Sequence, residues 1–168
     1  MNLPNKLTVL RVIMIPFFIF FLMYKEGEDA GFRVAALTIF IIAALTDTLD
    51  GIIARKYNLI TNFGKFMDPL ADKLLVCSAL ICLIQLKRID AIIVTVIISR
   101  EFIISGFRLV ASDSGIVIAA GIWGKIKTVS QMLCICLLIM DIDTLSNFTN
   151  IMIYVMLALT IISLIDYI

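Results

Sequence analysis

Long apolar blocks separated by short charged stretches run along almost the whole chain, and this pattern constrains the fold most strongly. Hydrophobic residues make up 62% of the 168 residues, and charged residues only 16%. Soluble domains are nearer half apolar and carry about a quarter charged residues. A helix needs about 20 mostly apolar residues to cross the hydrocarbon core of a bilayer. The blocks therefore predict an all-α, polytopic membrane protein.

We expect six transmembrane helices in a single domain that covers residues 1–168. The predicted spans are residues 8–24, 32–55, 64–86, 89–109, 125–140 and 147–165. The residues before the first span are expected to form a short N-terminal interfacial segment. Pro4 lies in this segment and suits the start of a helix.

The basic residues are distributed unevenly between the two ends of these predicted helices. All but four of the 14 lysines and arginines fall on one side. The four exceptions are Lys25, Arg33, Lys87 and Arg88. Because short cytoplasmic loops are enriched in Lys and Arg, we expect both termini to be cytoplasmic. The net charge of +1 gives no indication of nucleic-acid binding.

Four aspartates on this predicted cytoplasmic side form the main candidate site. Asp47 and Asp50 are three residues apart and Asp68 and Asp72 are four apart, so each pair shares a helix face. A turn through residues 57–62 would bring the two pairs together as a helical hairpin. Ionised carboxylates cost several kcal/mol each in apolar surroundings unless something offsets that cost. The cluster is therefore expected to be functional.

Carboxylates in this number favour Mg²⁺, Mn²⁺ or Ca²⁺ over zinc or copper. Two divalent ions bridged by carboxylates recur in phosphoryl chemistry. The chain has no histidine, so a general base must be a carboxylate, a lysine, a tyrosine or metal-bound water. Gly51 and Ala54 leave room for a ligand or a neighbouring helix beside the first pair. The alternative is that the four acids form only interfacial salt bridges.

The whole pattern resembles the signature of the CDP-alcohol phosphotransferase family, including the eight-residue gap before Gly64. The matching residues are Asp47, Asp50, Gly51, Ala54, Arg55, Gly64, Asp68 and Asp72. The resemblance implies six transmembrane helices, a homodimer, and two ions of Mg²⁺ or Mn²⁺ as cofactors.

The resemblance also implies a role for each residue of the signature. Asp47, Asp50 and Asp68 would bind both metal ions, and Asp72 would bind one of them. Asp72 would also act as the general base that takes a proton from the acceptor alcohol. The residues that would bind the CDP-lipid are Gly51, Ala54, Arg55 and Gly64. The alcohol oxygen would attack the β-phosphorus, which carries the lipid, and CMP would leave.

Basic residues in the second half of the chain indicate the acceptor. Arg100 and Arg108 are eight residues apart, about two turns, on roughly one side of the fourth predicted helix. Lys125 and Lys127 open the fifth predicted helix on the same membrane side. Together they predict a cationic pocket for a phosphate carried by the acceptor. The alternatives are that Arg100 pairs with Glu101 and that the two lysines only anchor the helix.

Residues 99–109 and 124–131, with the opening ten or so residues, resemble one bacterial branch of that family. The resemblance implies a protein of the bacterial cytoplasmic membrane, in contact with membrane lipid, and the distribution of basic residues predicts that its site lies on the cytoplasmic side. The resemblance implies CDP-diacylglycerol and sn-glycerol 3-phosphate as substrates, and phosphatidylglycerophosphate and CMP as products. Thr8 and Arg11 match the family's N-terminal motif and are further candidates for closing the site.

Other functions remain open at this level. A related enzyme would use inositol phosphate or a lipid alcohol as acceptor, which acceptor competition in a CMP-release assay would separate. An ion-coupled transporter would place its acids near the bilayer midplane beside broken helices, whereas these acids gather toward one side. A catalytically silent membrane scaffold would not need all four signature acids.

Overall fold

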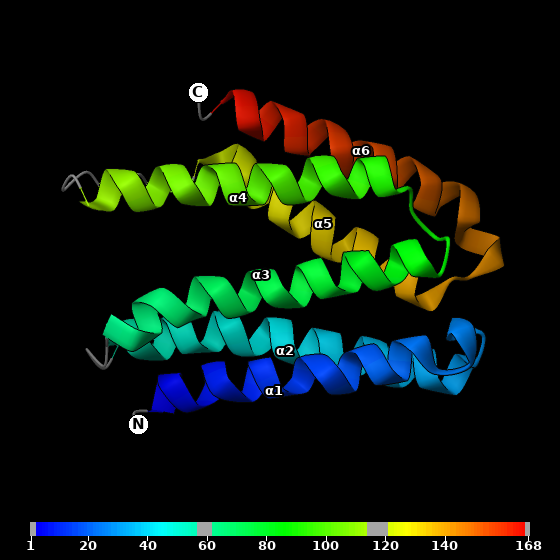
Figure 1. Cartoon of the computed structure of the whole chain (residues 1–168). Coiled ribbons are helices and arrows are strands. Elements are labelled where there is room, and N and C mark those ends of the chain that lie inside the picture. The colour runs from blue at the N-terminus through cyan, green and yellow to red at the C-terminus, as the bar shows by residue number, and fades with distance from the viewer. Residues whose placement is uncertain (1–2, 57–61, 114–120, 167–168) are drawn as a thin grey trace. The chain divides into compact units, whose positions relative to one another are not determined.

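The computed structural model describes residues 3–56, 62–113 and 121–166, and this part of the chain is all-helical. For residues 3–5, 47–56, 62–69 and 112–113 the description covers the backbone alone. The α-helices are α1 (Leu3–Met23), α2 (Ala30–Lys56), α3 (Asn62–Gln85), α4 (Ala91–Asp113), α5 (Ile122–Met140) and α6 (Ser146–Ile165) (Figure 1). Short 3₁₀ helices are η1 (Tyr24–Gly27) and η2 (Asp143–Leu145). The predicted all-α class is confirmed for the described residues.

The first helix begins before its predicted span. α1 starts at Leu3, so residues 3–7 form its first turns, and the interfacial position of this segment stays a prediction. Pro4 is tolerated there because the first backbone N–H groups of a helix have no acceptor within it. Pro16 lies inside α1, yet the helix continues to Met23.

Three helical stretches in the described part are long and apolar enough to cross a membrane. They are Lys6–Gly27, Ile122–Met140 and Asp143–Ile165. A shorter apolar stretch covers Ala30–Thr46 in α2. Of the other two helices, α3 has described side chains only from residue 70 to its end at Gln85, and α4 carries the charged residues Arg100, Glu101 and Arg108. The apolar helices indicate a membrane protein, and the number of six spans stays a prediction.

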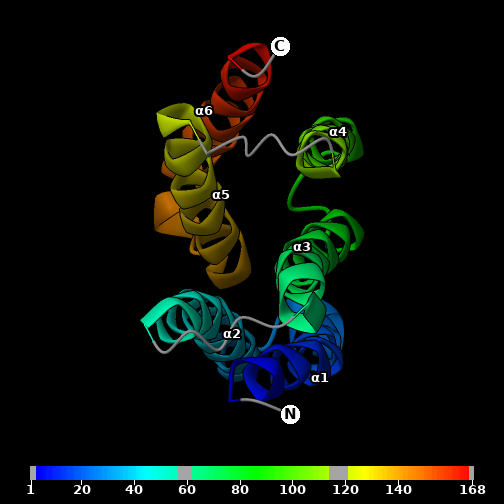
Figure 2. The ribbon, with the colours of Figure 1, turned by 90° about the vertical axis from the view of Figure 1, so that its left-hand side faces the viewer.

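The helices group into two compact units, an amino-terminal unit (Met1–Leu86) and a carboxyl-terminal unit (Lys87–Ile168). In the amino-terminal unit, consecutive helices run antiparallel and α1 packs along both α2 and α3 (Figures 1 and 2). In the carboxyl-terminal unit, α6 packs along α5 and also contacts α4 (Figure 2). The expectation of a single domain over residues 1–168 stays a prediction.

A tight corner joins α1 to α2. Lys25, Glu26 and Gly27 all have positive φ angles, of 48°, 56° and 72°, which reverse the chain within η1. The Asp29 carboxylate then accepts hydrogen bonds from the backbone N–H groups of Gly31 and Phe32, at 3.0 and 3.3 Å. Such a cap satisfies amide groups that have no acceptor within the helix. It fixes where α2 begins.

Arg88 binds the carboxyl-terminal end of α5. Its Nη1 donates to the carbonyl oxygens of Leu138 and Ile139, each at 3.1 Å. Its Nη2 lies 3.1 Å from Asp141 Oδ2, and Asp141 ends α5 with a left-handed φ of 48°. The last carbonyls of a helix lack partners within it, so a buried guanidinium there stabilises both the carbonyls and the helix dipole.

Candidate active site

The buried face of α1 changes character along its length. Ile15, Phe18 and Leu22 form its apolar part, and Phe18 packs on Phe40 of α2 with ring centroids 5.7 Å apart. The same three- and four-residue spacing runs back to Arg11 and Thr8, which are both fully buried. α1 therefore presents polar side chains to the interior of the unit at its amino-terminal end.

α2 continues this arrangement. Up to Thr46, where the described side chains of α2 end, its buried residues are Ala36, Phe40 and Ala43, and the same spacing leads onward to positions 47, 50 and 54. Arg11 Nε of α1 donates to the Ala43 carbonyl oxygen at 3.2 Å. Ala43 lies one turn before Asp47. This hydrogen bond therefore ties the polar end of α1 to the carboxyl-terminal half of α2.

The second aspartate pair lies in the second and third turns of α3. Ala71, Leu75 and Ala79 are buried along it, and Asp72 is half-buried at the start of this face. Asp68 lies one turn earlier.

The two aspartate pairs lie at matching depths along the hairpin of α2 and α3. Asp50 precedes the end of α2 at Lys56 by six residues, and Asp68 follows the start of α3 at Asn62 by six residues. Each is therefore about 9 Å from its helix end, at 1.5 Å per residue. Because the two helices are antiparallel, the four backbone positions share one end of the unit with the start of α1 (Figure 1).

Most side chains of the predicted metal and CDP-lipid sites lie outside the described part. They are Asp47, Asp50, Gly51, Ala54, Arg55, Gly64 and Asp68. The turn expected through residues 57–62 also lies outside it, apart from Asn62. Ligation by these residues stays a prediction.

The donor set nevertheless suits a divalent cation. Among the side chains that the structure describes, no three acids, cysteines or histidines are grouped to hold a metal ion, and only Asp72 of the four aspartates is included. The four backbone positions offer carboxylates alone, from two helices, at one end of the unit. Hard oxygen donors of this kind favour Mg²⁺ or Mn²⁺ over zinc or copper.

The carboxyl-terminal unit repeats the same organisation. α4 buries Val94 and Ile97 before the buried Arg100. α6 buries Ile153 and Met156 before the buried polar residues Thr160 and Ser163. α5 runs the other way, with buried polar residues first and apolar ones later; they are Lys127, Ser130, Gln131, Cys134, Ile135, Leu138 and Ile139.

The polar ends of these helices meet in one hydrogen-bonded cluster, which we call the Glu101 cluster (Arg100, Glu101, Lys127, Gln131 and Ser163). Glu101 Oε1 accepts from Lys127 Nζ and from Arg100 Nη1, the latter at 3.2 Å. Lys127 Nζ also donates to Gln131 Oε1, and Arg100 Nη2 donates to Ser163 Oγ. α4 also packs on α6, and the contact between Lys127 and Glu101 joins α4 to α5.

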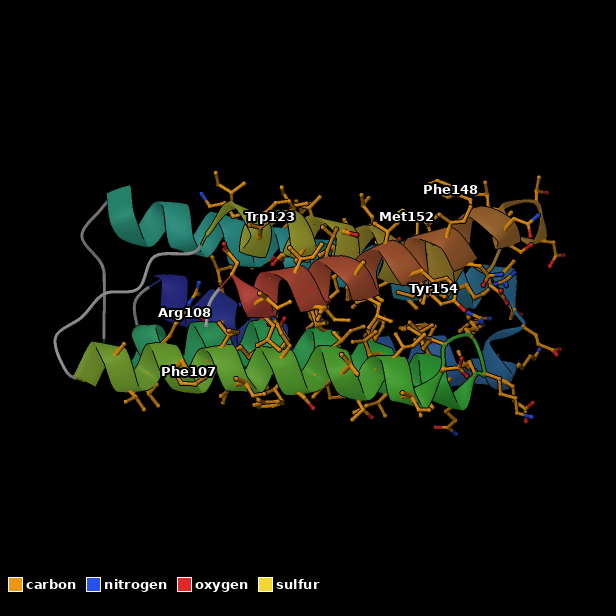
Figure 3. All side chains as sticks on the ribbon, turned by 90° about the horizontal axis from the view of Figure 1, so that it is seen from above. Phe107, Arg108, Trp123, Phe148, Met152 and Tyr154 are labelled. Carbon is orange, nitrogen blue, oxygen red and sulfur yellow. The ribbon has the colours of Figure 1, made fainter. Side chains whose placement is uncertain are left out.

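The predicted acceptor residues are placed in different ways. Arg100 and Arg108 share one side of α4, with the buried Ile104 between them, and Arg108 is half-buried (Figure 3). Lys127 is only 1% exposed, whereas Lys125 is exposed. Two residues apart on a helix, the lysines face different directions, so Lys125 does not join the Glu101 cluster.

The structure also bears on the alternative interpretations of Arg100 and of the two lysines. The contact between Arg100 and Glu101 exists, as the salt-bridge interpretation expected, but Glu101 is shared with Lys127. Lys127 is buried, so it is not a solvated anchor, whereas the exposed Lys125 fits either interpretation.

Sequence reasoning assigned no role to Ser163, Gln131 or Ser130. A signal was present for Ser163, since it continues the spacing of Ile153, Met156 and Thr160 along an otherwise apolar helix. Polar residues in such a buried row indicate a polar interior at that end of the unit.

The outer surface of the carboxyl-terminal unit is apolar and aromatic. Phe107, Trp123, Phe148 and Tyr154, labelled in Figure 3, are between 43% and 67% exposed. Exposed aromatic and aliphatic side chains of this density suit contact with lipid rather than water. In the same unit Arg100 and Lys127 are buried, at 6% and 1% exposed.

A comparison with known families shows which family the chain belongs to. Residues 1–162 match the family model described as CDP-alcohol phosphatidyltransferase. The chain belongs to this family.

Curated relatives of this phosphatidyltransferase extend the match. A CDP-diacylglycerol–glycerol-3-phosphate 3-phosphatidyltransferase of Bacillus subtilis is 49% identical over 148 residues, 83% of this chain and 77% of the relative. A protein of the same name from Haemophilus influenzae is 40% identical over 171 residues, 99% and 91% of the two chains. A probable phosphatidylglycerophosphate synthase of Mycobacterium tuberculosis is 37% identical over 169 residues, 99% and 80%.

Proposed function

We propose that this protein transfers the phosphatidyl group of CDP-diacylglycerol to sn-glycerol 3-phosphate, giving phosphatidylglycerophosphate and CMP. The observation that carries the proposal is the match to relatives named for this reaction, at up to 49% identity over most of the chain. The complete aspartate signature supports the reaction class, and the buried cations of the Glu101 cluster support a phosphorylated acceptor.

Asp72 is the proposed general base. Its half-buried side chain lies in α3 next to the buried Ala71 and one turn before the buried Val76. It takes the proton from the acceptor hydroxyl as that oxygen attacks the β-phosphorus, and the bond to CMP breaks. A carboxylate suits this role because the chain contains no histidine.

Asp47, Asp50, Asp68 and Asp72 would hold two divalent ions, Mg²⁺ or Mn²⁺. When bound, such ions neutralise a diphosphate and stabilise the leaving group. Gly51, Ala54, Arg55 and Gly64 would receive the CDP part of the lipid. Arg11, through its bond to the Ala43 carbonyl, would keep the carboxyl-terminal half of α2 in place.

Arg100, Arg108 and Lys127 are the proposed ligands of the acceptor phosphate. Guanidinium groups suit phosphate because they offer paired donors in a fixed geometry. Lys125 is exposed and would act on the approaching anion from the surface.

The proposal includes an arrangement in the membrane. The protein would cross the bacterial cytoplasmic membrane six times, with the aspartates on the cytoplasmic side, and would assemble as a homodimer. The uneven distribution of basic residues supports this orientation.

The test is a CMP-release assay on the purified protein with CDP-diacylglycerol and one acceptor at a time. We expect turnover with sn-glycerol 3-phosphate, and phosphatidylglycerophosphate as the lipid product. Inositol phosphate and a lipid alcohol serve as competing acceptors. Turnover with one of these and none with glycerol 3-phosphate would reject the proposed acceptor.

Removal of divalent ions gives a separate prediction for the same site. Chelation should abolish CMP release, and Mg²⁺ or Mn²⁺ added in excess of the chelator should restore it, because the four carboxylates otherwise repel the diphosphate. An unchanged rate after chelation would remove metal ions from the mechanism. Ca²⁺ added alone at the same concentration shows whether the identity of the divalent ion affects the rate of CMP release.

A further inference from the structure

Two buried polar atoms beside Lys127 have no hydrogen-bond partner among the described residues. They are Ser130 Oγ and Gln131 Nε2 on α5. Their residues are only 8% and 4% exposed. A buried donor left unpaired costs the full desolvation free energy of that group, so native proteins rarely keep one without a reason. An acceptor atom supplied by a ligand would remove the cost.

The orientation of the Gln131 amide is fixed by its neighbour. Lys127 Nζ can only donate, so the amide oxygen of Gln131 faces it and the amide nitrogen points the other way. Glu101 holds Lys127 from its other side. Gln131 Nε2 is therefore a donor held in place next to a buried ammonium group.

The surroundings are suited to an anion. Arg100 and Lys127 carry two positive charges against the one negative charge of Glu101, which leaves one positive charge in excess. Gly124 lies beside Arg100 and adds no side chain there. A Cβ at this position would lie 3.9 Å from Arg100 Nη2, in van der Waals contact. Ser130 and Gln131 add hydrogen-bond donors to this region without adding charge.

We propose that Gln131 determines specificity for the acceptor phosphate, with its Nε2 donating to a phosphoryl oxygen that Lys127 also contacts. Ser130 Oγ is a second donor to the same phosphate group. This inference rests on the proposed function, because it assigns the Glu101 cluster to the acceptor. It adds two neutral donors to a site for which the sequence suggested cations alone.

Steady-state kinetics of Gln131→Met tests the assignment, since methionine keeps the length of the side chain and removes both donor and acceptor. We expect the KM for glycerol 3-phosphate to rise about tenfold, as for loss of one hydrogen bond to a charged group. The Ki of inorganic phosphate as a competitive inhibitor should rise by a similar factor. The kcat and the KM for CDP-diacylglycerol should stay within about twofold of wild type.

Two further variants sharpen the comparison. Gln131→Glu keeps an oxygen facing Lys127 and loses the amide donor, so it should also weaken phosphate binding. Thr128→Val is the matched control, because Thr128 is exposed on the same helix and donates only to the Gly124 carbonyl oxygen. It should leave every constant unchanged. If Gln131→Met does not fold, Gln131→Glu and Ser130→Ala decide.

Each other outcome would overturn the inference. An unchanged KM and Ki would show that Gln131 does not contact the acceptor. A lower kcat with unchanged KM and Ki would indicate a structural role, and a raised KM with unchanged Ki would place Gln131 at the hydroxyl end.

Calorimetric binding of inorganic phosphate to the resting protein gives the same comparison without turnover. Failure of the wild type to use glycerol 3-phosphate would instead reject the proposed function.

Discussion

At the scale of single residues, Asp72 differs from its three partners in the signature because two roles are proposed for it. Asp72→Asn keeps the size of the side chain and removes its capacity to accept a proton. We expect CMP release to fall by about 10²–10⁴-fold, the usual contribution of a general base, while CDP-lipid binding largely survives. The measurement pairs an activity assay with equilibrium binding of the CDP-lipid.

Asp143→Asn is the control for Asp72, since Asp143 is exposed in η2. It should retain full activity. If Asp72→Asn turned over at the wild-type rate, Asp72 would not be the general base, and another group would take the proton from the acceptor hydroxyl.

Arg11 is a second residue whose effect can be predicted. Arg11→Met removes the donor to the Ala43 carbonyl from a fully buried position. We expect a loss of about 1–3 kcal/mol in the free energy of unfolding, with a parallel loss of activity, because α1 no longer holds the end of α2 that carries Asp47. Thermal unfolding in detergent and CMP release measure the two effects.

Lys6→Met provides the comparison for Arg11, because Lys6 lies exposed on the same helix. If the two variants unfold at the same temperature, the bond between Arg11 and the Ala43 carbonyl does not stabilise the unit.

At the scale of elements, the carboxyl-terminal end of α5 depends on Arg88. Arg88→Met removes the donors to the Leu138 and Ile139 carbonyls and the ion pair with Asp141. We expect the Tm in detergent to fall by about 4–8 °C, as for a loss of about 2 kcal/mol in a chain of this length. Lys87→Met changes the exposed neighbouring residue and should leave the Tm unchanged.

The existence of the six helices was predictable, because each apolar block is long enough to specify a helix. The predicted span 147–165 agrees with α6 (Ser146–Ile165) to one residue at its start. Helix ends were less predictable where polar residues continue a helix beyond its apolar part. α4 extends to Asp113, past the predicted end at residue 109, since backbone hydrogen bonding does not stop with hydropathy.

The candidate site was predictable as spacing within helices and unpredictable as contacts between them. The pairs Asp47 with Asp50 and Asp68 with Asp72 follow directly from helical periodicity. The bridge from Glu101 to Lys127 joins residues 26 apart on different helices, and no single-helix period contains it.

At the scale of the whole molecule, the predicted orientation can be tested on one helix. Lys6 and Glu28 are exposed at opposite ends of Lys6–Gly27, which is long enough to span the membrane. In a cysteine-free background, a membrane-impermeant maleimide should label Glu28→Cys on intact cells. It should label Lys6→Cys only after the cells are opened, since the amino-terminal end is predicted to be cytoplasmic. The reverse pattern would place the aspartates outside.

The alternation of apolar and polar halves along the buried faces has a consequence for synthesis in the cell. Arg100 and Glu101 leave the ribosome before Lys127 and Ser163, the partners that later contact them. Until those residues emerge, the Arg100–Glu101 ion pair lacks its partners on α5 and α6, and such charged groups resist entry into lipid. We therefore expect α4 to wait beside the translocon and to enter the bilayer together with α5 and α6. The last helix to be made would then complete the insertion of the fourth.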